Sequence, residues 1–146
     1  MYRRDREVVA DFDGGELLYL RYSIEQFVQG QLAPGAIRSQ QSVNRGNFGE
    51  PEDVLFSEAG RYNGFGVVGL KVSDIPPRVD QPNGPAYLFF MMHRPEDDNY
   101  AHSEIWSDRD PPTGDFRKPS PTVSTTFRLL LCRSITHEQV LIQAVR

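Results

Sequence analysis

A short stretch that is apolar at every position constrains the fold of this chain most strongly. Residues 87–92 read Tyr-Leu-Phe-Phe-Met-Met. A continuous run of this length predicts a central strand that is covered on both faces. Residues 100–106 read as a second strand, and only the short acidic loop 95–99 separates the two. We therefore expect an antiparallel hairpin inside a sheet.

Three more segments are typical of strands. Residues 16–22 and 64–72 are short apolar runs, and the glycines of the second run indicate that another backbone or a ligand comes close. The Gly-Gly turn before residue 16 predicts a hairpin with residues 8–12. Residues 140–145 favour a last strand, with a helix begun by the Thr136–Gln139 capping box as the alternative.

Helix signals occur at three places. Ser23 and Gln26 have capping-box spacing, which predicts a short helix over residues 24–30. Pro51 followed by two acids opens a second one, with residues 54–56 on its buried side. Ser120 and Pro121 resemble an N-cap and a first helical residue, and apolar residues follow at helical spacing.

Together these signals predict an α+β fold: a mostly antiparallel sheet with about three short helices, in a single, loop-rich domain over residues 1–146. The eleven prolines and twelve glycines imply many turns. Residues 36–49 are expected to form an irregular loop or an edge strand, and residues 107–119 a proline-rich loop. The predicted core is centred on Val68, Leu70, Leu88, Phe90, Phe127 and Leu131.

Charge and cysteine content exclude several classes of protein. The net charge of −4 argues against general nucleic-acid binding, because phosphate contacts require a basic excess. Cys132 is the one cysteine, so no internal disulfide forms, and its apolar surroundings predict a buried side chain. No apolar run approaches membrane-spanning length, and the charged N-terminus does not read as a signal peptide. We therefore expect a cytoplasmic protein without a membrane partner.

The histidines give the first candidate site. His102 and Glu104 point to the same face of the strand predicted over residues 100–106. The predicted hairpin would bring His93 near them. A histidine beside a carboxylate can act as a general acid or base. Alternatively, the two side chains are a paired polar couple on a partly exposed sheet face.

The second candidate site is the polar tract over residues 38–47. It offers side-chain donors and a glycine backbone that could hold an anion. The alternative is a surface loop whose Asn and Ser side chains satisfy their own backbone. The candidate binding residues of this tract are Arg38, Ser42, Asn44 and Arg45.

No complete catalytic or metal motif accompanies these candidates. His102 and Glu104 could supply two metal ligands, but a site normally needs three or four. Residues 64–69 spell the dinucleotide-binding pattern by letter, but they lie inside an apolar strand instead of between a strand and a helix. We expect neither a metal nor a cofactor.

A scattered set of three residues is similar to the signature of ADP-ribosyltransferase-like folds. These are Arg21 in an early strand, Ser42 in the middle of the chain and the late Glu104. The resemblance covers isolated residues without a linked motif. It implies a nucleotide-using enzyme, in which Arg21 would bind the ligand.

Two functions are compatible with these patterns. The first is a non-enzymatic module that binds a partner protein or a small anionic ligand. The alternative is a small nuclease-like or NAD-using enzyme acting on a phosphate-bearing substrate, with His102 and Glu104 as acid and base and Arg45 as the anion clamp. The enzyme hypothesis requires Arg45, His102 and Glu104 to line one cleft, and it fails if they lie on separate faces.

Overall fold

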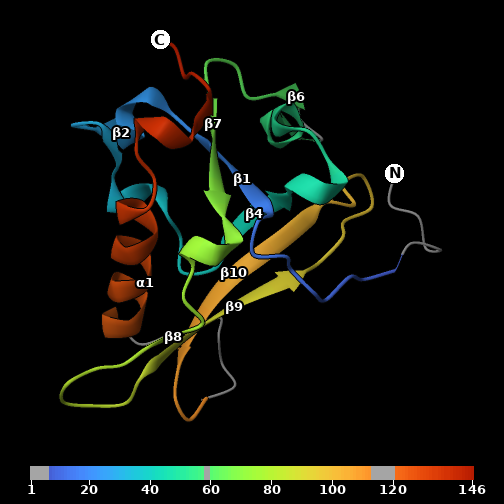
Figure 1. Ribbon diagram of the computed structural model, residues 1–146. Coiled ribbons are helices and arrows are strands. Elements are labelled where there is room, and N and C mark those ends of the chain that lie inside the picture. The colour runs from blue at the N-terminus through green and yellow to red at the C-terminus, as the bar shows by residue number, and fades with distance from the viewer. Residues whose placement is uncertain (1–6, 58–59, 113–120) are drawn as a thin grey trace.

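A seven-stranded antiparallel sheet forms the body of the protein (Figure 1). The computed structural model describes residues 7–57, 60–112 and 121–146. The strand order is β11-β7-β1-β4-β10-β9-β8. The strands of this sheet are β1 (Leu17–Tyr22), β4 (Gln41–Arg45), β7 (Gly66–Lys71), β8 (Arg78–Val79), β9 (Tyr87–His93), β10 (His102–Arg109) and β11 (Val140–Ile142).

Smaller elements lie at the ends of these strands. Two hairpins are formed by β2 (Phe27–Val28) with β3 (Gln31–Leu32) and by β5 (Phe56–Ser57) with β6 (Gly60–Arg61). The 3-10 turns are η1 (Ile24–Gln26), η2 (Pro34–Ala36), η3 (Gly46–Phe48), η4 (Pro51–Leu55), η5 (Val72–Asp74) and η6 (His137–Gln139). The α-helix α1 (Pro121–Arg133) lies beside the sheet (Figure 1). No helix within the described ranges is long and apolar enough to cross a membrane.

The predicted hairpin of β9 and β10 is confirmed, but the predicted covering of both faces is wrong. Phe90 pairs with Trp106 across the two strands. Side chains alternate along β9, so that Phe89 is buried whereas Phe90 and Met92 are each 40% exposed. The reason is that α1 packs on one face of the sheet only. Phe90 is therefore not a core residue.

The first strand has other partners than expected. β1 pairs with β4 and β7, so the predicted hairpin with residues 8–12 is wrong. Side chains bind the backbone of that segment instead: the Val9 amide donates to Nδ1 of His93, and the Val9 carbonyl accepts from Arg45. The turn at residues 14–15 is present, but it leads out of an irregular segment.

β4 departs furthest from the sequence prediction. A loop or an edge strand was expected over residues 36–49, but β4 lies in the interior of the sheet between β1 and β10. Val43 is its one buried apolar side chain, and the polar residues around it concealed the strand in the sequence. The interior position of β4 decides where its polar side chains lie.

The number of helices is also smaller than predicted, since α1 is the one α-helix among the described residues. The capping boxes at Ser23 and Thr136 both form, yet each begins a three-residue 3-10 turn that leads into a strand. The helix expected after Pro51 is likewise a 3-10 turn, and Phe56 beyond it is 57% exposed instead of buried. The last strand is confirmed as β11, whereas Ser120 and residues 113–119 lie outside the described residues.

The main core lies between the sheet and α1. Val123, Phe127 and Leu131 of the helix pack with alternate residues of the strands, such as Leu18 and Leu70. Of the predicted core, Val68, Leu70, Phe127 and Leu131 are fully buried, and Leu88 is half-buried. Cys132 is also fully buried, and burial raises the pKa of its thiol to about 11. It is a small apolar core residue, as predicted.

The close approach predicted for the glycines is confirmed at Gly66. A Cβ atom there would lie 2.3 Å from the carbonyl oxygen of Ile142 and 2.5 Å from the amide nitrogen of Ala144. Backbone occupies the space that any other side chain would need. Gly66 therefore allows the C-terminal segment to cross beside β7.

We expect Phe127→Ala to destabilise the fold by about 3–5 kcal/mol, because it removes a buried ring and leaves a cavity. Leu129→Ala is the matched control, since Leu129 lies on the same helix and is 38% exposed. Its cost should stay under about 1 kcal/mol. Urea denaturation of both variants measures the difference, and equal losses would contradict the packing described here.

Candidate functional site

A polar pocket of about 820 Å³ lies over the face of the sheet opposite α1. Its floor is made by side chains of three adjacent strands, β1, β4 and β10. Its walls come from residues of η4 and of the two-stranded β5–β6 hairpin region on one side, and from the loop between β9 and β10 on the other. The floor residues are Tyr19, Arg21, Ser42, Asn44 and His102.

The pocket brings three residues of the predicted polar tract together with Arg21 and His102, which the sequence analysis treated apart from it. The predicted candidates that line it are Arg21, Arg38, Ser42, Asn44 and His102. The predicted candidates that do not line it are His93, Arg45 and Glu104. Alternation along β4 explains part of this division, since Ser42 and Asn44 face the pocket while Arg45 faces the other way.

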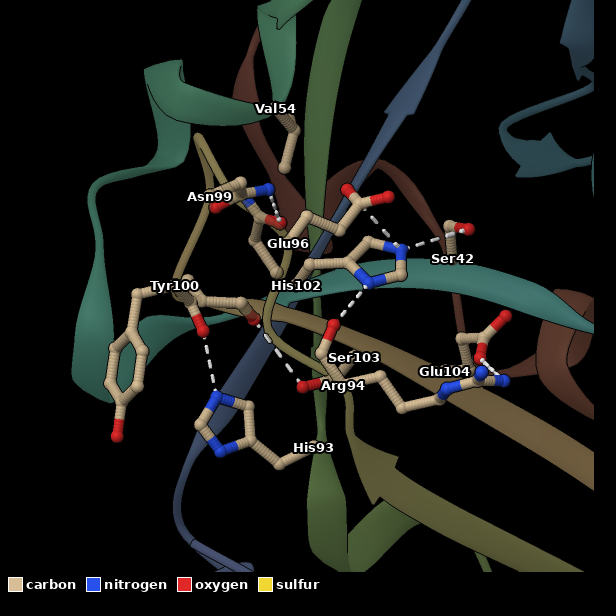
Figure 2. A network of polar contacts seen from close by, with 12 residues as sticks. Ser42, Val54, His93, Arg94, Glu96, Asn99, Tyr100, His102, Ser103 and Glu104 are labelled. Carbon is tan, nitrogen blue, oxygen red and sulfur yellow. Dashed lines mark hydrogen bonds and ion pairs between the residues drawn. The ribbon is translucent and has the colours of Figure 1, made fainter. Parts of the chain in front are cut away.

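His102 is held in one orientation by the end of the hairpin (Figure 2). Its Nδ1 lies 2.7 Å from the carbonyl oxygen of Arg94, and the Arg94 amide donates to the carbonyl of His102 at 3.0 Å. Its Nε2 lies 3.3 Å from Oγ of Ser42 and 3.9 Å from a carboxylate oxygen of Glu96. One ring nitrogen, Nδ1, therefore contacts the backbone, and the other, Nε2, faces the pocket.

Asn44 lies beside His102 and is held by the same loop, between β9 and β10. The two residues are register partners across β4 and β10. The side-chain amide of Asn99 donates to Oδ1 of Asn44 at 2.7 Å. Asn44 is 3% exposed, and its own Nδ2 has no hydrogen-bond partner among the residues that the structure describes. This leaves a buried donor at the pocket floor.

Glu104 lies on the predicted face of β10, but its carboxylate binds side chains other than His102. It accepts from Arg94 at 2.7 Å and from Gln40 at 2.6 Å. The acid nearest to the imidazole of His102 is Glu96, in the hairpin loop. The predicted pairing of His102 with Glu104 is therefore wrong, because the hairpin loop folds back over the strand.

Arg45 has a different environment from the one expected of an anion clamp. Its guanidinium lies on the face of the sheet away from the pocket and donates to both carboxylate oxygens of Glu16, at 2.8 and 2.9 Å. It also donates to the carbonyls of Val9 and Asp11 and stacks on the ring of Phe12. Its residue exposure is 1%, so the predicted pocket shared by Arg45 and His102 does not form.

His93 is likewise part of the framework. Its Nδ1 accepts the amide hydrogen of Val9 at 2.9 Å, so Nε2 carries the ring proton toward the carbonyl of Tyr100 at 2.7 Å. The ring stacks on Phe48 and is 1% exposed. Burial lowers the pKa of His93 below its ordinary value of 6.5, although the contact with the Tyr100 carbonyl opposes this.

Sequence patterns gave no sign of the pocket walls. Tyr62 lies under the guanidinium of Arg21, 3.9 Å from the ring centroid, and Arg21 also reaches the Val54 carbonyl at 3.4 Å. Asp53, Glu96 and Asp98 add carboxylates to the lining. These residues lie in turns and loops, where neither periodicity nor a motif marks them. Across residues 7–57, 60–112 and 121–146, no three His, Cys, Asp or Glu residues are grouped to hold a metal ion.

The burial of His93 predicts a loss of stability in mild acid. The lowered pKa means that the unfolded chain takes up this proton before the folded protein does. The His93 contribution is therefore complete above about pH 6.5 and declines as the pH falls below that value. NMR titration should show that the His93 ring stays neutral below the ordinary histidine pKa of 6.5. A His93 that titrates at or above about 6.5 would contradict its buried, neutral state.

The three residues that resemble the ADP-ribosyltransferase signature lie on adjacent strands. Glu104 and Ser42 are register partners across β10 and β4, and Arg21 lies on the neighbouring β1. Arg21 and Ser42 line the pocket, whereas Glu104 is held by Arg94 and Gln40. Comparison with known proteins gives no support for a relationship: no protein family, no curated protein and no solved structure matches this chain.

Proposed function

We propose that the protein binds a small polar ligand carrying an anionic group in the pocket over β1, β4 and β10. The observation that carries this proposal is that Arg21 of β1 meets Arg38, Ser42 and Asn44, which lie close together in the chain, in one cavity. Its volume of about 820 Å³ is within the range of small-molecule sites. A small ligand therefore fits this site better than a partner protein does.

The two pocket arginines differ from three others that pair with carboxylates. Arg45, Arg78 and Arg94 all form ion pairs with carboxylates. Arg21 and Arg38 are exposed and form no ion pair within the described part of the chain. A guanidinium can bind a carboxylate or a phosphate through two parallel hydrogen bonds. These two arginines are thus the groups that would bind an anion.

Other lining residues restrict the charge of the ligand. Asp53, Glu96 and Asp98 would repel a polyanion, in keeping with the net charge of −4. The same carboxylates can accept hydrogen bonds from hydroxyl or amino groups. Tyr62 and Phe65 offer aromatic surface for an apolar portion of the ligand. The site suits one anionic group on a molecule that also carries donors.

Arg21→Ala should weaken the binding of inorganic phosphate, used as the probe, by about 10- to 100-fold, because a charge-assisted hydrogen bond is lost. Arg133→Ala is the control, since Arg133 is an exposed arginine at the end of α1, away from the pocket. NMR titration of the labelled protein gives both the affinity and the location. In the wild type, the amide signals that move should be those of β1, β4 and the β9–β10 loop.

Two results would contradict the proposal. One is a set of phosphate-dependent shifts scattered over the surface without saturation. The other is an equal loss of affinity in the Arg21→Ala and Arg133→Ala variants, which would show that phosphate responds only to overall charge.

A further inference from the structure

Ser42 and His102 place a hydroxyl and an imidazole together at the floor of the pocket. Oγ of Ser42 lies 3.3 Å from Nε2 of His102, although sixty positions separate the two residues in the chain (Figure 2). Ser42 is exposed to the pocket and His102 is half-buried. The hydroxyl can therefore be reached by a bound molecule while the imidazole stays fixed behind it.

The partner of Nδ1 determines the direction of the hydrogen bond at Nε2. A backbone carbonyl can only accept, so Nδ1 of His102 carries the proton that it donates to the carbonyl of Arg94. In the neutral ring, Nε2 is then without a proton and accepts the hydroxyl hydrogen of Ser42. This is the tautomer that a general base needs in order to activate a serine.

The imidazole is held rigidly enough for that role. The Arg94 amide donates to the carbonyl of His102, which closes the hairpin at the same two residues. The loop beyond them is closed by paired amide and carbonyl groups of Glu96 and Asn99, and the Asn99 side chain ties it to Asn44 on β4. His102 is thus fixed relative to β4, which carries Ser42.

Two neighbouring groups complement the charges that such a reaction creates. Glu96 lies 3.9 Å from Nε2 and favours the imidazolium that forms when His102 takes the serine proton. Asn44 faces the pocket from the same side of β4 as Ser42, and its buried Nδ2 has no partner among the described residues. An amide donor of this kind can stabilise a developing oxyanion.

From this geometry we propose that Ser42 is a nucleophile, activated by His102, for the cleavage of a small carboxylic ester that carries an anionic group. The inference rests on the proposed function, because the pocket arginines would position the substrate. Oγ of Ser42 forms a bond to the carbonyl carbon, and its proton passes to Nε2 of His102. The bond between that carbon and the ester oxygen then breaks, and the leaving alcohol takes the proton from His102. Water then gives a proton to the same nitrogen and forms a bond to the carbonyl carbon. The bond between that carbon and Oγ of Ser42 breaks, which releases the acid, and Oγ takes the proton back from His102.

The test uses two probes with the full chain: a fluorophosphonate, which labels activated serines, and p-nitrophenyl acetate. We expect a single phosphonyl adduct at Ser42 by peptide mass spectrometry, and a burst of nitrophenol. The rate of labelling should depend on the imidazole of His102. His102→Gln should slow it by at least about 100-fold, the usual contribution of a general base. His137→Gln and Ser73→Ala are matched controls at exposed positions, and both should label like the wild type.

A second variant keeps the inference testable if His102→Gln fails to fold. Ser42→Cys places a thiol at the same position, and its alkylation by iodoacetamide should be faster at neutral pH than that of a cysteine introduced at Ser73. Equal rates at the two positions would overturn the activation of residue 42. So would labelling of Ser42 no faster than labelling of Ser73 in the wild type.

The phosphate titration separates this inference from the proposed function. Saturable phosphate binding without labelling of Ser42 would overturn the nucleophilic role of Ser42 but would support the proposed anion-binding site. Labelling of Ser42 that inorganic phosphate does not inhibit would support the activated serine but contradict the role of the arginines in binding the anion.

Discussion

Arg45 and Glu16 form an ion pair that solvent hardly reaches, and the arrangement of the central strands depends on it. The guanidinium is bound by both carboxylate oxygens of Glu16 and by two backbone carbonyls of the N-terminal segment. These hydrogen bonds offset the cost of burying the two charges. Removal of either side chain of the pair would leave the other charge buried and uncompensated, and would destabilise the fold by about 3–5 kcal/mol. The pair joins the end of β4 to the residues that lead into β1.

The position of β4 in turn determines the chemistry of the sheet. β4 is paired on both sides, and its side chains alternate between the two faces of the sheet, as in any β-strand. Val43 and Arg45 contribute to the framework, and Ser42 and Asn44 contribute to the pocket. Neighbouring strands add Arg21 and His102 to that second face. A strand that carries polar residues on both faces can thus stabilise the fold with one set and present the other to a ligand.

The features that sequence predicted well are those with a local signal. Apolar runs marked β1, β7 and the β9–β10 hairpin, and helical spacing marked α1. β4 was missed because its polar residues resemble a loop, and its strand character depends on two partners distant in the chain. The pairing of Arg45 with Glu16 and the position of Glu96 beside His102 were missed for a similar reason. Each depends on how segments far apart in sequence meet in the fold, which spacing does not reveal.

The separate environments of Arg45 and Arg21 can be measured through their guanidinium Nε–H protons. By NMR, the proton of Arg45 should exchange slowly with solvent, show a nuclear Overhauser effect to the ring of Phe12, and keep its shift when phosphate is added. The proton of Arg21, which lies over Tyr62 at the pocket, should exchange quickly and shift on phosphate addition. A phosphate-dependent shift at Arg45 with none at Arg21 would contradict the division of β4 and its neighbours into a structural face and a binding face.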